Sequence, residues 1–234
     1  MQASRTVAHA LIDTLLSPTA AFDAVRSKPA WAWAALALIA LLGGISILVF
    51  LAGMSPDWIV DQQLLSDSSL SDNERADARA MLLDIAPYTG AIGAAFGAIS
   101  LPIMAGLLAL VYFLSERVLA RQRNGYGRWF AAASFSLLPL VLGSLGLIAL
   151  RLSNSAQNLP LDMAQYSSLN NLWLGLAPGE SGYALAGSVN VLYLWCAFLA
   201  AVAARAWSEL DWPRALLLGM LPYVLVFGVW WALV

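Results

Sequence analysis

Residues able to carry out covalent or metal chemistry are scarce in this sequence. The single histidine, His9, lies far along the chain from any serine of an apolar segment, so no such serine has a base beside it. The single cysteine, Cys196, has no second cysteine with which to form an internal disulfide bond. Seven acidic residues in segment 52–87 are of the type that binds Ca²⁺ or Mg²⁺, but their spacing does not match a calcium-binding loop, and a solvated acidic surface explains them. We therefore expect no enzyme activity, no cofactor and no bound metal ion.

The most polar point inside any long apolar segment is Asn190, which has Ser188 and Tyr193 close to it in sequence. A membrane asparagine usually links helices through a hydrogen bond worth about 0.6–2 kcal/mol. Alternatively, these side chains line a polar cavity. The three residues are therefore our candidates for contact with a ligand or cavity.

Prolines and glycines inside the apolar segments predict where helices bend or meet. Pro102, Pro139 and Pro222 each remove a backbone hydrogen bond and can kink a helix. Kinked helices occur at transporter sites, although proline is also simply more frequent in membrane helices. Gly93 and Gly97, four residues apart, favour the close approach of another helix, and the chain could form a homo-oligomer.

The composition places these residues in a membrane protein. Of 234 residues, 61% are hydrophobic and only 11% are charged, and the mean hydropathy is +0.74. Soluble domains have about 25% charged residues, so too little polar surface is left here to coat a globule. The net charge of −2 argues against nucleic-acid binding. We expect the lipid bilayer to be the main partner.

Gaps between charged residues predict five membrane-spanning helices. Each gap exceeds the roughly 17–25 residues that a helix needs to cross a bilayer. The predicted spans are about 31–51, 88–114, 129–150, 183–204 and 215–234. They contain no Asp, Glu, Lys, Arg or His, which argues against a proton-coupled transporter. The predicted fold is thus an all-α integral membrane bundle, with a membrane domain over 31–234.

The distribution of positive charge predicts the orientation. Nine of the twelve Lys and Arg residues lie before the first span or in the loops after the second and fourth spans. The remaining three lie in loops 52–87 and 151–182. Because positive loops stay in the cytoplasm, we expect a cytoplasmic N-terminus, two external loops and an external C-terminus.

Segment 1–30 is expected to form short amphipathic helices at the membrane surface. Apolar residues recur at helical spacing from Val7 to Leu16, and Ser17-Pro18 resembles the start of a second helix. These helices either lie flat in the headgroup layer or dock a cytoplasmic protein partner. The candidate interfacial or docking residues are Leu11, Leu15, Phe22 and Trp31.

The two external loops have different characters. In the first, Ser71 and Glu74 form a capping-box pattern that predicts a helix through Leu83. The second is long and mostly uncharged, and is either a lid or a segment lying on the membrane. Its stretch 169–176, with Trp173 at the centre, could dip into the outer leaflet.

Three stretches resemble the bacterial branch of the Ypt-interacting protein (Yip-type) membrane domain family. The stretches are LLSPTAAFDAVRSKPAWAW before the first span, GYGRWFAAASFSLLPLVLGSL in the third and WPRALLLGMLPYVL in the fifth. The resemblance implies a five-helix bundle with a cytoplasmic N-terminus in a bacterial inner membrane. Eukaryotic relatives are associated with Rab-type GTPases, but their longer N-terminal domain and acidic signature are absent here. The resemblance carries over no catalytic residue.

Two functions from different classes fit this sequence. The first is a non-enzymatic membrane assembly or partner-recruiting protein, which the charge-free spans and the amphipathic entry favour. The alternative is a permease or lipid-handling protein with a cavity between kinked helices. A hydrophilic or lipid-sized groove that reaches Asn190 would favour the alternative, whereas a closed apolar bundle would favour the first.

Overall fold

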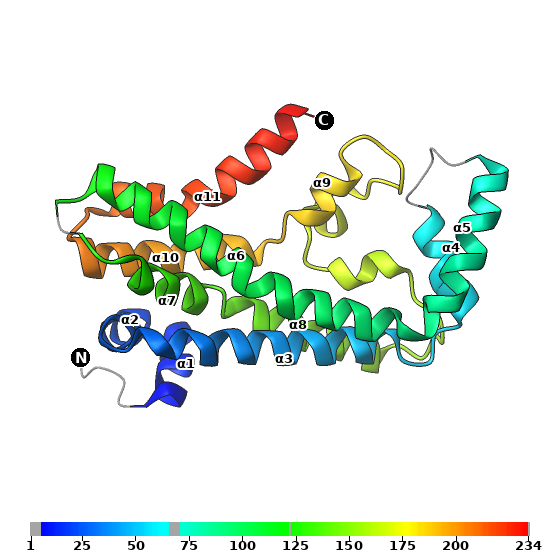
Figure 1. Cartoon of the computed structure of the whole chain (residues 1–234), viewed down its shortest axis with the longest axis horizontal. Coiled ribbons are helices and arrows are strands. Elements are labelled where there is room, and N and C mark those ends of the chain that lie inside the picture. The colour runs from blue at the N-terminus through cyan, green and yellow to red at the C-terminus, as the bar shows by residue number, and fades with distance from the viewer. Residues whose placement is uncertain (1–5, 66–70, 122, 234) are drawn as a thin grey trace.

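The computed structural model describes residues 6–65, 71–121 and 123–233, and this part of the chain is helical without strands, as predicted (Figure 1). The helices are α1 (Val7–Leu16), α2 (Pro18–Ser27), α3 (Ala32–Leu51), α4 (Pro56–Leu65), α5 (Asp72–Ile85), α6 (Thr89–Leu119), α7 (Tyr126–Ser136), α8 (Pro139–Ser153), α9 (Tyr183–Ser188), α10 (Leu192–Ser208) and α11 (Trp212–Leu233). Short 3-10 turns cover Pro29–Trp31, Ala86–Tyr88 and Leu161–Gln165, and a π turn covers Asn170–Leu174.

Four segments of the described chain are long and apolar enough to cross a membrane. They are Pro29–Leu51, Asp72–Leu119, Tyr126–Ser153 and Trp212–Leu233. The fifth apolar helix of the bundle, α10, has 17 residues and is about 26 Å long, slightly less than the roughly 30 Å of hydrocarbon in a bilayer. The predicted count of five spans is therefore approximate, and the class, a multi-pass α-helical membrane protein, is confirmed.

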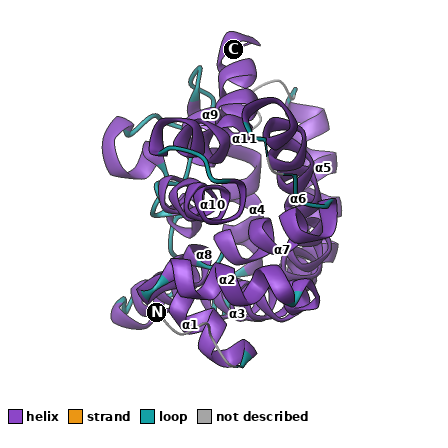
Figure 2. Cartoon of the chain, turned by 90° about the vertical axis from the view of Figure 1, so that its left-hand side faces the viewer, coloured by secondary structure: helices purple, strands orange, loops and turns teal. Residues whose placement is uncertain are grey.

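The centre of the bundle is α10, which packs against α11, α2, α7 and α8 (Figure 2). Its second half is rich in alanine, and Ala200, Ala201, Ala203 and Ala204 are fully buried. Such small side chains let neighbouring backbones come close. The closest approach is to α11, where a Cβ added at Gly219 would collide with the carbonyl oxygen of Ala197.

The proline positions have different outcomes in the structure. The predicted span 129–150 is two helices, because the chain turns at Leu137–Leu138 and Pro139 then starts α8. Proline suits this first helical position, where no backbone N–H is needed. In contrast, α6 and α11 continue as single helices through Pro102 and Pro222.

The predicted span 183–204 is not one continuous helix. The chain leaves helical geometry between α9 and α10, at Val189 and Asn190, and pairs there with loop 152–182. The backbone N–H of Leu169 donates to the carbonyl of Val189 at 2.7 Å, and the N–H of Val191 donates to the carbonyl of Ser167 at 3.0 Å. These bonds replace the helical ones that the break removes, so the interruption leaves these backbone groups satisfied.

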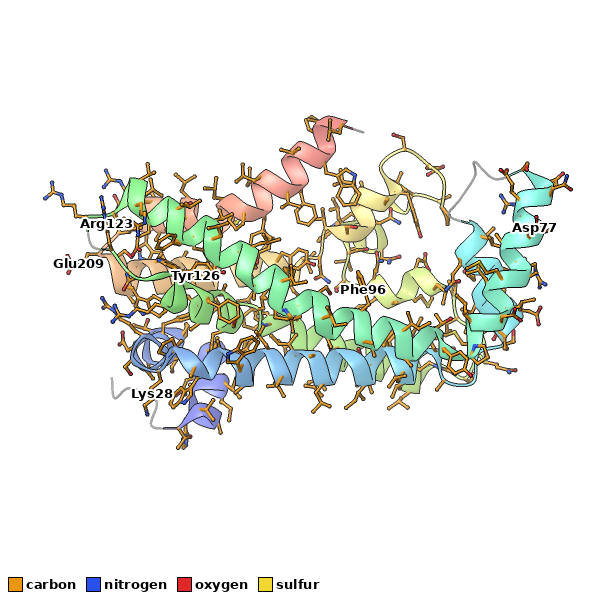
Figure 3. All side chains as sticks on the ribbon, viewed as in Figure 1. Lys28, Asp77, Phe96, Arg123, Tyr126 and Glu209 are labelled. Atoms are coloured by element: carbon orange, nitrogen blue, oxygen red, sulfur yellow. The ribbon has the colours of Figure 1, made fainter. Side chains whose placement is uncertain are left out.

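The two ends of the bundle carry opposite charge. We call the end with α1, α2, the last turn of α6 and residues 209–211 the basic end, and the end with α4 and α5 the acidic end. Figure 3 shows Lys28 and Arg123 at the basic end and Asp77 at the acidic end. At the basic end, α2 starts at Pro18 after Ser17, as predicted, and lies across the bundle.

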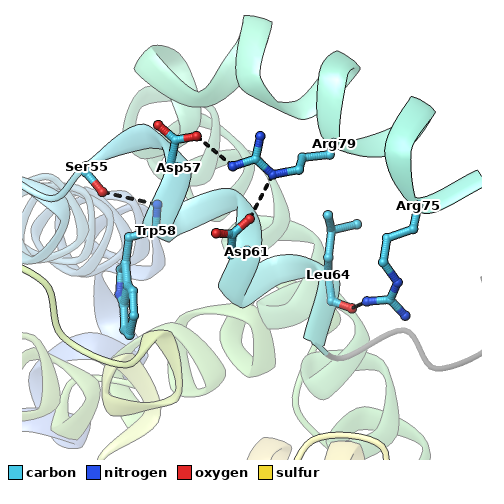
Figure 4. Close-up of polar contacts among 7 residues, drawn as sticks. All are labelled: Ser55, Asp57, Trp58, Asp61, Leu64, Arg75 and Arg79. Atoms are coloured by element: carbon cyan, nitrogen blue, oxygen red, sulfur yellow. Dashed lines mark hydrogen bonds and ion pairs between the residues drawn. The ribbon is translucent and has the colours of Figure 1, made fainter. Parts of the chain in front are cut away.

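The acidic end is a hairpin in which Arg75 and Arg79 of α5 bond to α4, with Arg75 donating to the carbonyl of Leu64 at 3.1 Å (Figure 4). Arg79 forms ion pairs with Asp57 at 2.6 Å and with Asp61 at 2.9 Å. Hydrogen bonds to Asp57 and then to Asp61 raise the pKa of Arg79 above its ordinary value. The predicted capping box is present at the start of α5, where Ser71 and Glu74 each accept from the other's backbone N–H.

The acidic residues of this end are not gathered into one place. Among the described residues, no group of three or more His, Cys, Asp or Glu side chains is placed to hold a metal ion. Asp67, one of the seven acidic residues of the loop, lies outside the described residues.

Candidate functional site

Two adjoining cavities of about 480 and 540 Å³ lie between α11 and segment 169–194. We call them together the α11 groove. The side chains common to both cavities are Leu169, Val189, Val224 and Phe227. The first cavity extends to Asn190, Tyr193 and Trp173, and the second extends to Ala186, Gly228 and Trp231.

The groove exists because α11 packs tightly along its first half alone. Ala215, Leu218, Gly219 and Pro222 are buried, whereas Val224, Val229 and Trp231 are 58%, 58% and 73% exposed. Figure 1 shows this second half running away from the bundle. On the opposite side, the break at Asn190 turns the chain away from the line of α10. A space therefore opens between the two elements.

The structure brings two of the three predicted polar residues to this groove. The Asn190 amide donates to Ser167 Oγ at 2.9 Å, and its carbonyl oxygen accepts from the backbone N–H of Leu192 at 2.9 Å. Asn190 thus holds the helix break in place. Tyr193 stacks on Tyr223 and Phe227, with ring centroids 5.5 and 6.0 Å apart.

Ser188, the third predicted residue, does not line either cavity. Its hydroxyl donates to the carbonyl of Ala184 at 2.8 Å, within α9. The groove lining is therefore almost entirely aliphatic and aromatic, and the amide of Asn190 is already bonded to Ser167 and Leu192. Such a surface suits a hydrocarbon chain and offers little to an ion or a sugar.

A second site, absent from the sequence-based prediction, is a buried carboxyl group at the basic end. Glu116 lies near the end of α6 and is fully buried. Its Oε2 accepts from the backbone N–H of Asn124 and from Trp129 Nε1, both at 2.8 Å. Its Oε1 accepts from the Asn124 amide at 2.6 Å and from the Ser208 hydroxyl. Four donors from three separate segments thus converge on one side chain.

Further contacts connect this cluster to α2. The Trp207 indole donates to the carbonyl of Phe22 at 3.1 Å, and the two rings meet edge to face with centroids 6.1 Å apart. Arg26 of α2 donates to the carbonyl of Trp207 at 3.4 Å. Trp207 also packs against Trp129, at 5.7 Å between centroids. Glu116 therefore lies at the centre of a contact network that joins α2, α6, α7 and α10.

Glu116 was missed because a charged residue just after a predicted span looks like an ordinary boundary residue. The available signal in the sequence was its position shortly before Asn124 and Trp129, which supply three of its four donors. Only the packing of Ser208, 92 positions away in sequence, completes the site.

The predicted N-terminal docking residues are divided between core and surface. Phe22 is fully buried, which corrects its assignment as an interfacial or docking residue. Leu11, Leu15 and Trp31 are partly buried against the main core. The more exposed apolar side chains of α1 are Ile12 and Leu16, which are 58% and 76% exposed.

The predicted glycine pair, Gly93 and Gly97, lies in the N-terminal half of α6. A Cβ added at Gly93 would lie 3.8 Å from Ile47 of α3, and one added at Gly97 would have nothing within 4 Å among the described residues. Gly93 thus faces a helix of this chain, while Gly97 faces open space.

Comparison with known proteins places the chain in a family. The Yip1 domain matches residues 12–233, which is nearly the whole sequence. No curated protein and no solved structure matches the chain.

Proposed function

Since the chain belongs to the Yip1 domain family and is a multi-pass membrane protein, we propose that it is a non-enzymatic protein that holds the acyl chain of a membrane lipid in the α11 groove. We prefer the lipid-handling function to the assembly function, because the groove is lipid-sized and reaches Asn190.

The single observation that carries the proposal is the match between the groove and a hydrocarbon chain. Both cavities fall within the roughly 300–1,000 Å³ of typical small-molecule sites, and their walls are apolar. Trp173 and Val224 line the groove and are 67% and 58% exposed, so its wall continues onto the outer surface. An acyl chain could therefore enter sideways from the bilayer.

The depth of the groove supports one leaflet as the source of this lipid. The break at Asn190 is separated from the basic end by α10, a distance of about 26 Å. In a bilayer with about 30 Å of hydrocarbon, this puts the break in the leaflet on the side of the acidic end. We expect the lipid of that leaflet to occupy the groove.

The test uses phosphatidylcholine vesicles that contain a phosphatidylcholine with a photoactivatable diazirine in its acyl chain. After illumination, cross-linked peptides are quantified by mass spectrometry. We expect the strongest labelling in segments 169–194 and 220–231. Gly228→Phe fills the second cavity and should lower that labelling several-fold, because a Cβ at Gly228 meets no described atom within 4 Å and the variant should fold.

Gly97→Phe is the matched control, since Gly97 also faces open space on an apolar helix but lies outside the groove. It should leave labelling of the two groove segments unchanged. Uniform labelling of all lipid-facing helices, or equal loss in both variants, would contradict the proposal.

A second candidate function, recruitment of a cytoplasmic protein, is favoured by the exposed apolar side chains Ile12 and Leu16 on α1. The test is Leu16→Cys, because the natural cysteine, Cys196, is buried and an introduced thiol would react selectively. A bifunctional thiol–amine reagent in native membranes should give one discrete cross-linked protein. Reaction with lipid amines alone would show that α1 is only a membrane anchor.

We further propose that the protein lies in a bacterial inner membrane with its basic end in the cytoplasm. The excess of Lys and Arg at this end supports the orientation. The exposed apolar side chains of Ile99, Ile103 and Leu107 on α6 support a homo-oligomer in which a second copy packs against this face of the helix.

A further inference from the structure

A third groove, of about 460 Å³, lies at the basic end between the start of α2, the last turns of α10 and the start of α11. One turn of α10 separates its deepest residue, Phe198, from Leu194 of the α11 groove, and the two grooves share no lining residue. Its principal side chains are Thr19, Phe198, Val202, Arg205 and Trp212. We call it the Arg205 groove.

The Arg205 groove is cationic at one end and apolar at the other. The Arg205 guanidinium lies 4.5 Å from the centre of the Trp212 ring, which stacks on Phe198 at 6.0 Å with an angle of 7° between planes. Arg205 is exposed and, among the residues that the structure describes, no carboxylate forms an ion pair with it. Its charge is thus open to an anion.

The first turn of α2 adds to this positive end. Pro18 and Thr19 line the groove, so the N-terminal end of α2 borders the same space as Arg205. The N-terminal end of a helix carries a partial positive charge, and the Ser17 side chain makes no capping hydrogen bond to it. Two independent elements, Arg205 and the start of α2, therefore favour a negatively charged group at this end of the groove.

The order of these side chains with depth below the membrane surface matches the order of chemical groups in a phospholipid. Arg205 lies in the last turn of α10, at the level of a membrane surface, and Phe198 lies seven residues earlier, about 10 Å deeper. Val202 lies between them. An indole at Trp212 is typical of the headgroup layer. A cationic side chain at the membrane surface is thus followed by the apolar side chains of Val202 and Phe198 at greater depth, in the order of a phosphate and its acyl chain.

We propose that the Arg205 groove binds an anionic phospholipid, with its phosphate at Arg205 and the start of α2 and its acyl chain along Val202 and Phe198. The bound lipid would fasten α2 to α10 and α11 at the membrane surface. This ligand lies at the opposite end of the bundle from the acyl chain in the α11 groove.

The test measures lipids that remain on the intact protein. The protein is reconstituted in vesicles of equal phosphatidylglycerol and phosphatidylcholine, released into mild detergent, and weighed by native mass spectrometry. We expect phosphatidylglycerol to be retained preferentially. One interfacial arginine alone is worth about fivefold in affinity for an anionic surface, and direct hydrogen bonds to phosphate add to this. Arg205→Gln should therefore lower retained phosphatidylglycerol about tenfold.

The matched control is Arg121→Gln, which removes an exposed arginine at the same end of the bundle but outside the groove. It should change retention less than twofold. Val202→Trp, which keeps Arg205 and fills the apolar part, should also lose the lipid. Gly228→Phe should retain it, which separates this site from the α11 groove.

Three results would overturn the proposal. Equal losses in the Arg205 and Arg121 variants would show diffuse attraction by the basic end. Equal retention of both lipids by the natural protein would show no anion site. Displacement of the lipid by millimolar inorganic phosphate would show a site for free phosphate rather than for a phospholipid. Unchanged unfolding temperatures are required for every variant that is compared.

Discussion

The hydrogen bonds to Glu116 should make this side chain one of the largest single contributors to stability at the basic end. Glu116→Ala removes the carboxylate acceptor of four buried donors: the backbone N–H and amide of Asn124, the Trp129 indole and the Ser208 hydroxyl. The Asn124 amide keeps only longer bonds of 3.4 Å to the Trp207 carbonyl and to Ser208 Oγ. Each buried donor without a partner costs about 1–3 kcal/mol. Even the lower value for each gives a loss of about 4 kcal/mol.

Glu116→Gln separates the hydrogen bonds from the packing, because it keeps the volume and one acceptor oxygen. Its new NH₂ group takes the place of Oε1 and faces the Asn124 amide and the Ser208 hydroxyl, which both donate to Glu116 in the natural protein. The Ser208 hydroxyl can rotate and accept, whereas the Asn124 amide loses its 2.6 Å bond to Oε1 and keeps only its 3.4 Å bonds. One lost hydrogen bond corresponds to about 1–2 kcal/mol. The expected order of stability is therefore the natural protein, then Glu116→Gln, then Glu116→Ala.

Thermal unfolding in detergent, followed by loss of tryptophan fluorescence anisotropy or by aggregation, measures this order. For a chain of this size, 1 kcal/mol shifts the Tm by about 2–4 °C. We expect Glu116→Ala to lower the Tm by about 8–16 °C and Glu116→Gln by about 2–8 °C. Glu74→Ala, at the exposed capping box of α5, controls for removal of a glutamate elsewhere.

A Tm for Glu116→Ala within about 2 °C of the natural protein would refute the reasoning, because it would show that the four donors find other partners at no cost. Equal shifts for Glu116→Ala and Glu116→Gln would also refute it. That result would mean that the shape of the side chain is irrelevant and its charge alone matters.

Three further predictions concern close contacts and topology. Gly219→Val should lower the Tm by several degrees, because its Cβ would collide with the backbone of α10, whereas Gly97→Val should leave the Tm unchanged. Gly146→Ala should loosen loop 152–182 and speed its proteolysis, since the new Cβ would meet the Tyr166 ring at 2.8 Å. Cysteines introduced at Ile12 and Asp77 should react with an impermeant maleimide from opposite sides of the membrane; labelling of both from one side would contradict the proposed topology.

Composition and local sequence patterns are sufficient to predict the class of this protein and most of its elements. Scarcity of charge is a property of composition, so it predicts membrane helices without knowledge of their neighbours. Local signals were equally reliable: the capping box at Ser71 and Glu74 and the helix start at Ser17-Pro18 depend on residues within one turn.

The tertiary structure alone decided where those elements break and what they enclose. The helix break at Asn190 depends on backbone bonds to Ser167 and Leu169, about twenty residues away, which a hydropathy pattern does not contain. The buried Glu116 side chain needs a hydrogen bond from the Ser208 hydroxyl of α10. Likewise, both proposed lipid grooves form between segments distant in sequence. Hydrophobicity places a residue in the bilayer, but only packing determines whether its side chain faces lipid, a cavity or another helix.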